Sequence, residues 1–426
     1  MTHRPTLDAM REATRLTRNG RLHEATALLQ QALHQARAAA DPPARADASP
    51  GEVFDVSFRE VETADDPARA PHVAPPAASA ASAANAPPAA APPDSSAARA
   101  QSGDFHASDF VQGLIGCLGA RPGAGTHRHP THPAPADLGP GRFIEGEFGN
   151  AAGRRSYRLY VPSTEHAAPL PLLVMLHGCH QSPEDFAAGT RMNLQAEASG
   201  CLVLYPAQAP QANASGCWNW FKREDQVRGR GEPSILADMT RDVMARHAVD
   251  PQRVYAAGLS AGGAMAAVLA VTYPDLFAAV AIHSGLACGA AQDLPSALAA
   301  MRGMPNPAVA ADAAASSPVP TIVFHGDRDR TVHPRNGAQF STQFDAGASN
   351  AAPDAQATTE RGQAAGGHAW TRILRRDASG HVVLEYWQVH GGGHAWFGGS
   401  QSGSYTDPRG PDASAQILRF LLSHRR

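Results

Sequence analysis

The chain has few cysteines, no block of basic residues and, over positions 1–41, no long apolar run. Its five cysteines include no Cys-x-x-Cys pair, which argues against a disulfide framework and against the common zinc motifs. A formal net charge of -3 gives no electrostatic reason to expect nucleic acid or an anionic membrane as a partner. Charges interrupt positions 1–41 throughout, so neither a signal-peptide core nor a transmembrane segment is predicted, and a cytoplasmic location is expected.

What is present divides into three regions by composition. Residues 1–40 show two apolar periodicities of helical spacing around the turn Asn19-Gly20, which predicts a small helical hairpin. A lone hairpin cannot bury both apolar faces, so we expect it to pack on the rest of the chain, to self-associate or to bind a hydrophobic granule. Residues 41–141 are rich in Ala, Pro and Ser, which predicts a largely disordered linker. Residues 142–426 are predicted to form the folded domain.

Short apolar runs alternate with helical stretches from Arg142 onward. Such continuous runs are typical of parallel strands buried on both faces. They lie at 172–176, 202–205, 254–257, 278–282 and 321–324, and the helical stretches lie at 234–247, 261–273 and 413–422. This alternation predicts an α/β fold with a doubly wound, mostly parallel sheet, and ligands are expected at the carboxyl ends of its strands.

The strongest chemical motif stands at one of those strand ends. Gly258-Leu259-Ser260-Ala261-Gly262 follows a predicted strand and precedes a predicted helix, which is the context of the G-x-S-x-G elbow of α/β-hydrolases. The glycines let strand and helix approach closely and hold the Ser260 hydroxyl up on a strained turn. Ser260 is therefore the candidate nucleophile, rather than part of an ordinary Gly-rich turn.

A serine nucleophile needs a base, and the base needs a carboxylate that fixes its tautomer. Both Asp327 and Asp329 follow the predicted strand at 321–324. We favour Asp329, because its spacing within residues 326–332 resembles the G-x-x-D-x-x-V loop that carries the acid in many such hydrolases. Asp327 remains the alternative, with turn capping as its other role.

The candidate base is His394, which stands on the Gly-rich loop after the strand-like stretch at 382–387. A histidine on such a loop can reach a strand-end cleft. Four other histidines near strand ends are expected to line the pocket or to satisfy backbone groups: His177, His283, His325 and His390. The developing oxyanion also needs donors, and we expect them to be the backbone N–H groups of Ala261 and Cys179.

Several motifs in order resemble the polyhydroxybutyrate depolymerase family of esterases, over roughly residues 142–426. They are His177-Gly178-Cys179 with Asp185-Phe186, then Asn213, then Cys217-Trp218-Asn219-Trp220-Phe221, Arg253-Val254-Tyr255, Tyr273-Pro274-Asp275-Leu276-Phe277 and Gly393-His394-Ala395-Trp396. The family includes feruloyl and acetylxylan esterases, so the resemblance implies carboxylic ester hydrolysis by a serine esterase. It also implies an extracellular location as the alternative, because many members are secreted.

Three tryptophans and two cysteines accompany the motifs. Trp218, Trp220 and Trp396 are expected to form an apolar wall for an acyl or aryl group, with core packing as their other role. A bridge between Cys179 and Cys217 would fix the oxyanion loop to the tryptophan segment, but it is not expected in a reducing compartment.

No metal and no organic cofactor is predicted. The histidines at 127, 129 and 132 lie among Pro and Gly without a fourth ligand, so they do not predict a metal site. The expected partner is an ester substrate, either a polyhydroxyalkanoate oligomer or a small acyl or aryl ester. Two alternatives stay open: a serine peptidase of the same fold and a non-catalytic granule-binding protein.

Overall fold

The computed structural model describes residues 138–164, 167–304, 319–340 and 357–426. The helical hairpin predicted at 1–40 and almost all of the linker predicted at 41–141 lie outside these residues, as do the histidines at 127–132. In the described part of the chain, no helix combines the length and the apolar character that crossing a bilayer would require.

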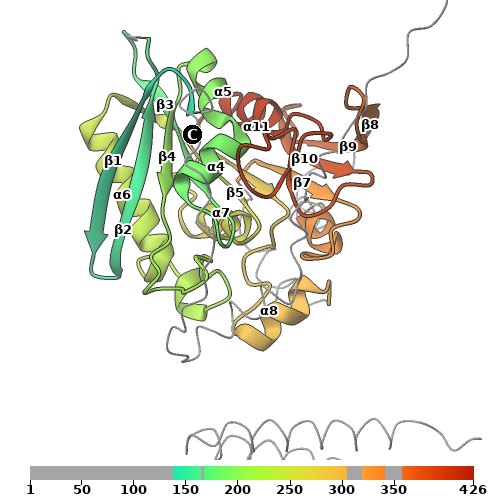
Figure 1. Ribbon diagram of the computed structural model, residues 1–426, viewed down its shortest axis with the longest axis horizontal. Helices are drawn as coiled ribbons and strands as arrows, with labels where there is room; N and C mark the ends of the chain where they lie inside the picture. Colours follow the sequence, from blue (N-terminus) through green and yellow to red (C-terminus); the bar gives the residue numbers. More distant parts are fainter. Residues whose placement is uncertain (1–137, 165–166, 305–318, 341–356) are drawn as a thin grey trace, which may run out of the picture. The chain divides into compact units, whose positions relative to one another are not determined.

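A ten-stranded sheet forms the centre of the domain, in the order β1-β2-β4-β3-β5-β6-β7-β10-β9-β8 (Figure 1). The strands are β1 Arg142–Asn150, β2 Gly153–Val161, β3 Leu170–Leu176, β4 Leu202–Pro206, β5 Val249–Leu259, β6 Ala279–His283, β7 Thr321–Gly326, β8 Thr358–Gln363, β9 Ala369–Arg376 and β10 Val382–Val389. The six strands from β4 to β10 are parallel, whereas β1, β2, β8 and β9 pair antiparallel at the two flanks. The predicted α/β class and mostly parallel sheet are confirmed, with antiparallel flanks that the apolar runs do not predict.

Helices cover both faces of the parallel strands, and this explains why those strands are apolar throughout. One face packs against α6 Gly231–Arg246, α7 Ala261–Thr272 and α8 Leu294–Met301, and the other against α4 Pro183–Thr190, α5 Met192–Ser199 and α11 Ala413–Leu422. Within β3, Leu172 and Val174 belong to the first of these cores, and Leu173 and Met175 belong to the second. Each strand thus supplies two hydrophobic cores.

The register of the parallel strands brings their carboxyl ends to one edge of the sheet. Leu259, the last residue of β5, pairs with His283 at the end of β6, and His283 pairs with Phe324 of β7. His325 of β7 in turn pairs with Gln388 of β10. The loops that follow these four strands therefore begin side by side, and they carry Ser260, Asp329 and His394.

Candidate active site

Ser260 occupies a strained turn between β5 and α7. Its backbone has φ +57° and ψ -119°, a conformation that side-chain-bearing residues seldom adopt. The Ser260 N–H donates to the carbonyl oxygen of His283 at 2.9 Å, which anchors the turn to the end of β6. Such a bend, between a buried strand and a helix, is the geometry of a nucleophile elbow.

The two outer glycines of the motif are required by close backbone packing. A Cβ atom on Gly258 would lie 2.3 Å from the carbonyl carbon and oxygen of Gly262. A Cβ atom on Gly262 would lie 2.0 Å from the carbonyl oxygen of Leu176, at the end of β3. The backbone is therefore packed so closely at positions 258 and 262 that no side chain fits there. The position of Ser260 between β5 and α7 depends on this close packing.

The Asp329 carboxylate is almost fully buried and lies 2.7 Å from His394, between its Oδ2 and Nδ1 of the imidazole. Its Oδ1 accepts the N–H groups of Thr331 and Val332 at 2.9 and 2.8 Å. Burial alone would raise the pKa of Asp329. The charge of His394 and hydrogen bonds from His394 and His325 outweigh burial and hold the pKa of Asp329 well below its usual range.

Asp327 binds a different histidine. Its Oδ2 lies 3.0 Å from Nδ1 of His390, and its Oδ1 accepts the N–H of Gly391 at 2.7 Å. The Arg328 N–H also donates to the carbonyl oxygen of Gly392 at 3.0 Å. Asp327 thus ties the loop after β7 to the start of the loop that carries His394. This role was not among those expected for it from the sequence.

Two of the other histidines named from the sequence, His283 and His325, are fully buried in the surroundings of this pair. His283 is fully buried, its Nε2 accepts the N–H of Phe397 at 3.1 Å, and its ring lies 4.9 Å from that of Trp396. Burial, followed by the charges of His325 and His394, places the pKa of His283 well below its usual range. His325 places its Nε2 2.8 Å from the carbonyl oxygen of Val332. His325 thus supports the loop after β7 that carries Asp329, and His283 supports the Ser260 turn through its carbonyl oxygen.

The loop after β3 lies against the elbow. A Cβ atom on Gly178 would be 3.7 Å from Cβ of Ser260 and 3.6 Å from the carbonyl oxygen of Leu259, which are ordinary van der Waals contact distances. This places the backbone of Gly178 and Cys179 next to Ser260, as the prediction of an oxyanion donor at Cys179 requires. The other expected donor, the N–H of Ala261, stands at the first position of α7, where the helix dipole favours negative charge.

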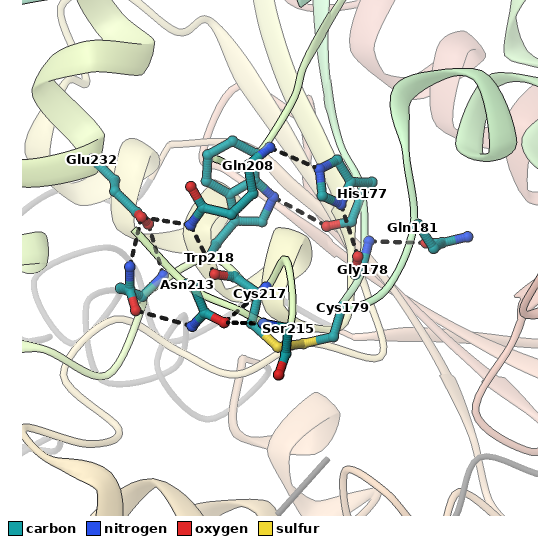
Figure 2. The surroundings of a disulfide bond; sticks show 11 residues. His177, Gly178, Cys179, Gln181, Gln208, Asn213, Ser215, Cys217, Trp218 and Glu232 are labelled. Carbon is teal, nitrogen blue, oxygen red and sulfur yellow. Dashed lines mark hydrogen bonds between the residues drawn. A yellow bond between two sulfur atoms is a disulfide. The ribbon is translucent and has the colours of Figure 1, made fainter. Parts of the chain in front are cut away.

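Cys179 and Cys217 form a disulfide with their Cα atoms 4.2 Å apart (Figure 2). The sequence left this bridge open and did not favour it in a reducing compartment, and the structure forms it. The two residues are 38 positions apart in sequence, and they meet because the loop after β3 packs against the segment that follows β4. Only the tertiary fold determines that distance.

The tryptophans do not form the predicted wall. Trp218 and Trp396 have no exposed surface: Trp218 donates its Nε1 to the carbonyl oxygen of His177, and Trp396 donates its Nε1 to Ser414. A side chain without exposed surface offers nothing for a substrate to contact, so the structure assigns these two to the core. Trp220 is 3% exposed and packs edge-on against Phe221.

No group of three or more His, Cys, Asp or Glu side chains gathers as a metal site would require within the described ranges. A surface hollow of about 340 Å³ lies between the β1–β2 turn and helices α6 and α7, and its lining includes Arg228, Arg241 and Tyr273. It shares no residue with the site around Ser260, and both arginines are paired with Asp275.

The strand order, the strained serine and the acid and histidine on the loops after β7 and β10 define an α/β-hydrolase fold. Residues 155–365 match the family described as esterase PHB depolymerase. Through this segment the chain belongs to that family.

Individual relatives carry several names. The chain is 37% identical over 206 residues to poly(3-hydroxyalkanoate) depolymerase C of Paucimonas lemoignei, covering 46% of this chain and 49% of the relative. It is 34% identical over 152 residues to feruloyl esterase B of Thermothelomyces thermophilus, covering 35% and 51%. Acetylxylan esterase A of Talaromyces purpureogenus is 29% identical over 288 residues, covering 61% and 72%.

The chain thus spans about half the length of the first two relatives. Among solved structures, an acetyl xylan esterase from Aspergillus awamori superposes with a TM-score of 0.48 and 23% identity, covering 56% of this chain and 89% of that one.

Proposed function

We propose that this protein hydrolyses carboxylic esters through an acyl-enzyme formed on Ser260. One arrangement carries the proposal: a serine on a strained strand-to-helix turn at the same sheet edge as a buried, hydrogen-bonded pair of His394 and Asp329. Membership of the esterase PHB depolymerase family supports the same chemistry.

The proposed mechanism assigns one task to each of these groups. The Asp329 carboxylate accepts the Nδ1–H of His394, which makes Nε2 the basic nitrogen of the ring. As Oγ of Ser260 attacks the ester carbonyl carbon, Nε2 takes the hydroxyl proton and later delivers it to the departing alkoxide. Water then attacks the acyl-enzyme with the same base, releasing the acid and restoring Ser260.

The negative oxygen of each tetrahedral intermediate needs donors that are already in place. We assign them to the backbone N–H groups of Ala261 and Cys179. The first stands at the start of α7 and the second on the loop whose Gly178 backbone lies against Ser260. Fixed donors of this kind stabilise the transition state without reorganising, and removing one usually costs about 3 kcal/mol.

We propose esters of short acyl or aryl acids, or hydroxyalkanoate oligomers, as the substrate class. The names of the relatives refer to polyhydroxyalkanoate, feruloyl and acetylxylan substrates. Each of these substrates contains an ester bond of a small carboxylic acid. A panel of oligo-hydroxybutyrate, methyl ferulate and acetylated xylan, compared by kcat/KM, identifies the preferred member.

The disulfide favours an oxidising compartment over the cytoplasmic location expected from the sequence, because cytosolic thiols are kept reduced. We therefore propose that the protein works outside the reducing cytosol. Thiol titration of protein rapidly alkylated in intact cells tests this. Alkylation of Cys179 and Cys217 would contradict it.

The sequence pattern of residues 1–40 supports a separate proposal, association with a hydrophobic granule or with a second copy. Deleting residues 1–140 should abolish granule sedimentation or self-association while leaving turnover of soluble esters intact. Unchanged association in the deletion variant would refute this proposal.

The central experiment compares wild-type protein with Ser260→Ala on p-nitrophenyl esters and on a matched p-nitroanilide. Wild-type protein should cleave the esters, and the variant should lose at least about 10³-fold in kcat. Ser423→Ala, in the turn after α11, is the matched serine control and should retain activity. Preferential anilide cleavage would favour the peptidase alternative, and ester turnover unaffected by Ser260→Ala would exclude the proposed nucleophile.

A further inference from the structure

One peptide group in the loop after β3 is clamped at its oxygen. The carbonyl oxygen of Gly178 accepts hydrogen bonds from Nδ1 of His177 at 2.7 Å and from the N–H of Gln181 at 3.3 Å. The described peptide bonds are trans, and in a planar trans peptide the N–H points opposite to the C=O. The bonds to the Gly178 oxygen therefore also set the direction of the Cys179 N–H.

The His177 ring is itself fixed in one tautomer. Its Nε2 lies 3.1 Å from the backbone nitrogen of Gln208, which can only donate, so Nε2 accepts and the proton sits on Nδ1. The ring is 1% exposed, and burial lowers the pKa of His177, which favours the neutral form. Both ring nitrogens are occupied by backbone groups, so this histidine is built to hold the loop.

The disulfide holds the same loop from the other side. Figure 2 shows Cys179 joined to Cys217 directly beside the Gly178 peptide. The carbonyl oxygen of Cys217 accepts the side-chain amide of Gln208 at 2.7 Å. Gln208 therefore contacts both groups that hold the loop. Its backbone N–H donates to His177, and its side-chain amide donates to Cys217.

A buried carboxylate anchors this assembly. Glu232 of α6 is 3% exposed and accepts the side-chain amide of Gln208 together with the N–H and the side-chain amide of Asn219, the last two at 2.7 Å each. Arg155 of β2 balances its charge at 3.2 Å. The network thus ties the loop to α6 and to the sheet.

We propose that His177 and the Cys179–Cys217 bridge form one device that positions the Cys179 N–H as an oxyanion donor. This inference rests on the proposed function and adds to it. His177 acts as a positioning residue: it touches neither substrate nor nucleophile and transfers no proton. The peptide plane between Gly178 and Cys179 is held in two places. His177 holds the Gly178 oxygen, and the disulfide holds the Cys179 side chain.

Two substitutions at His177 separate hydrogen bonding from bulk. His177→Leu removes the donor to the Gly178 oxygen. His177→Asn places an amide N–H near the position of Nδ1 and so keeps that donor. His381→Leu, an exposed histidine between β9 and β10 with a side-chain exposure of 79%, is the control for replacing a histidine.

The expected result is a loss in kcat with little change in KM, because an oxyanion donor acts in the transition state. We expect His177→Leu to lower kcat on p-nitrophenyl butyrate by about 10- to 100-fold, and His177→Asn to recover most of it. Inactivation by a p-nitrophenyl alkylphosphonate, whose adduct on serine is tetrahedral, should slow in parallel with kcat. If His177 had a purely structural role, His177→Leu would lower the stability of the protein, but kcat and the rate of inactivation would not fall together.

The disulfide provides an independent measurement. Reduction with a phosphine such as TCEP, which converts the bridge to two thiols, should lower kcat by about tenfold, again with KM within about twofold. Reoxidation should restore kcat. A Cys179→Ala/Cys217→Ala double variant should start at the lowered kcat and show no response to the phosphine. Near-ultraviolet circular dichroism verifies that the reduced protein remains folded.

The outcomes separate the two proposals. If wild-type protein shows no ester turnover, the proposed function and this inference both fail. If wild-type protein is active and Ser260→Ala is not, but folded His177→Leu and reduced protein keep the wild-type kcat, only this inference is overturned. If a variant fails to fold, the reductant arm on wild-type protein decides between the same two results.

Discussion

Nδ1 of His394 and Oδ2 of Asp329 lie 2.7 Å apart, and the carboxylate also accepts two backbone N–H groups of its own loop. Two residues earlier on that loop, Asp327 binds His390 instead. One short loop therefore supplies two acids to two histidines, and only one of these pairs is buried. The proposed mechanism needs the buried pair, since a carboxylate orients a base best where water does not compete.

Substitution of the two acids should give very different results. Asp329→Asn leaves an amide that can donate to Nδ1 of His394 and favour the wrong tautomer. We expect kcat on p-nitrophenyl butyrate to fall by about 10⁴-fold. Asp327→Asn should lose about tenfold or less, because Asp327 tethers the histidine loop without touching His394. A large loss of kcat in Asp327→Asn with a small loss in Asp329→Asn would show that Asp327, and not Asp329, orients the base.

Alanine substitutions at two glycines test the packing of the elbow. Gly262→Ala would bring its Cβ to 2.0 Å from the carbonyl oxygen of Leu176, so we expect loss of activity together with a lower melting temperature. Gly149→Ala in β1 is the matched control, because its nearest neighbours would lie 3.5 Å away, at ordinary contact distance. Thermal unfolding and ester turnover measure both. Wild-type turnover in Gly262→Ala would mean that helix α7 can move away from β3.

Trp396 should contribute to stability rather than to substrate preference. Its ring stacks on His283 and its Nε1 donates to Ser414 at 3.0 Å, with no surface exposed. Trp396→Ala should lower the free energy of unfolding by about 3–5 kcal/mol in urea titrations. The order of preference among p-nitrophenyl esters of increasing acyl length should stay the same. If Trp396→Ala changed the order of ester preference and kept wild-type stability, Trp396 would contact substrate, as the sequence predicted.

Asp225 should make the stability of the protein depend on pH. Burial, followed by the charge of Glu232, raises the pKa of Asp225 to about 7, whereas an unfolded aspartate titrates near 3.9. The folded state then binds its proton more tightly, so the free energy of unfolding falls as pH rises from about 4 to about 7.

Asp225→Asn removes this titration and keeps an oxygen for the N–H of Glu232. The variant should gain stability relative to wild type on going from about pH 5 to about pH 8, as measured by urea unfolding. An equal difference at both pH values would show that Asp225 does not titrate in this range.

Local sequence was enough to predict the strands that run to the site. The runs at 172–176 and 321–324 lie within β3 and β7, and the stretch 413–422 coincides with α11. These segments are buried on two faces or end at clear caps, so composition alone marks them. The four antiparallel strands at the flanks of the sheet, β1, β2, β8 and β9, are partly exposed and carry charges, and their pairing partners are what make them strands.

The sequence by itself determined the elbow, because glycines around a serine between an apolar run and a helix leave few other conformations. It also determined the order in which Ser260, Asp329 and His394 follow along the chain. The tertiary structure alone decided that Cys179 meets Cys217, that Trp218 and Trp396 are buried, and that Asp329 rather than Asp327 binds His394. Each of these depends on a distance between segments far apart in the chain, and residue type and spacing do not fix such distances.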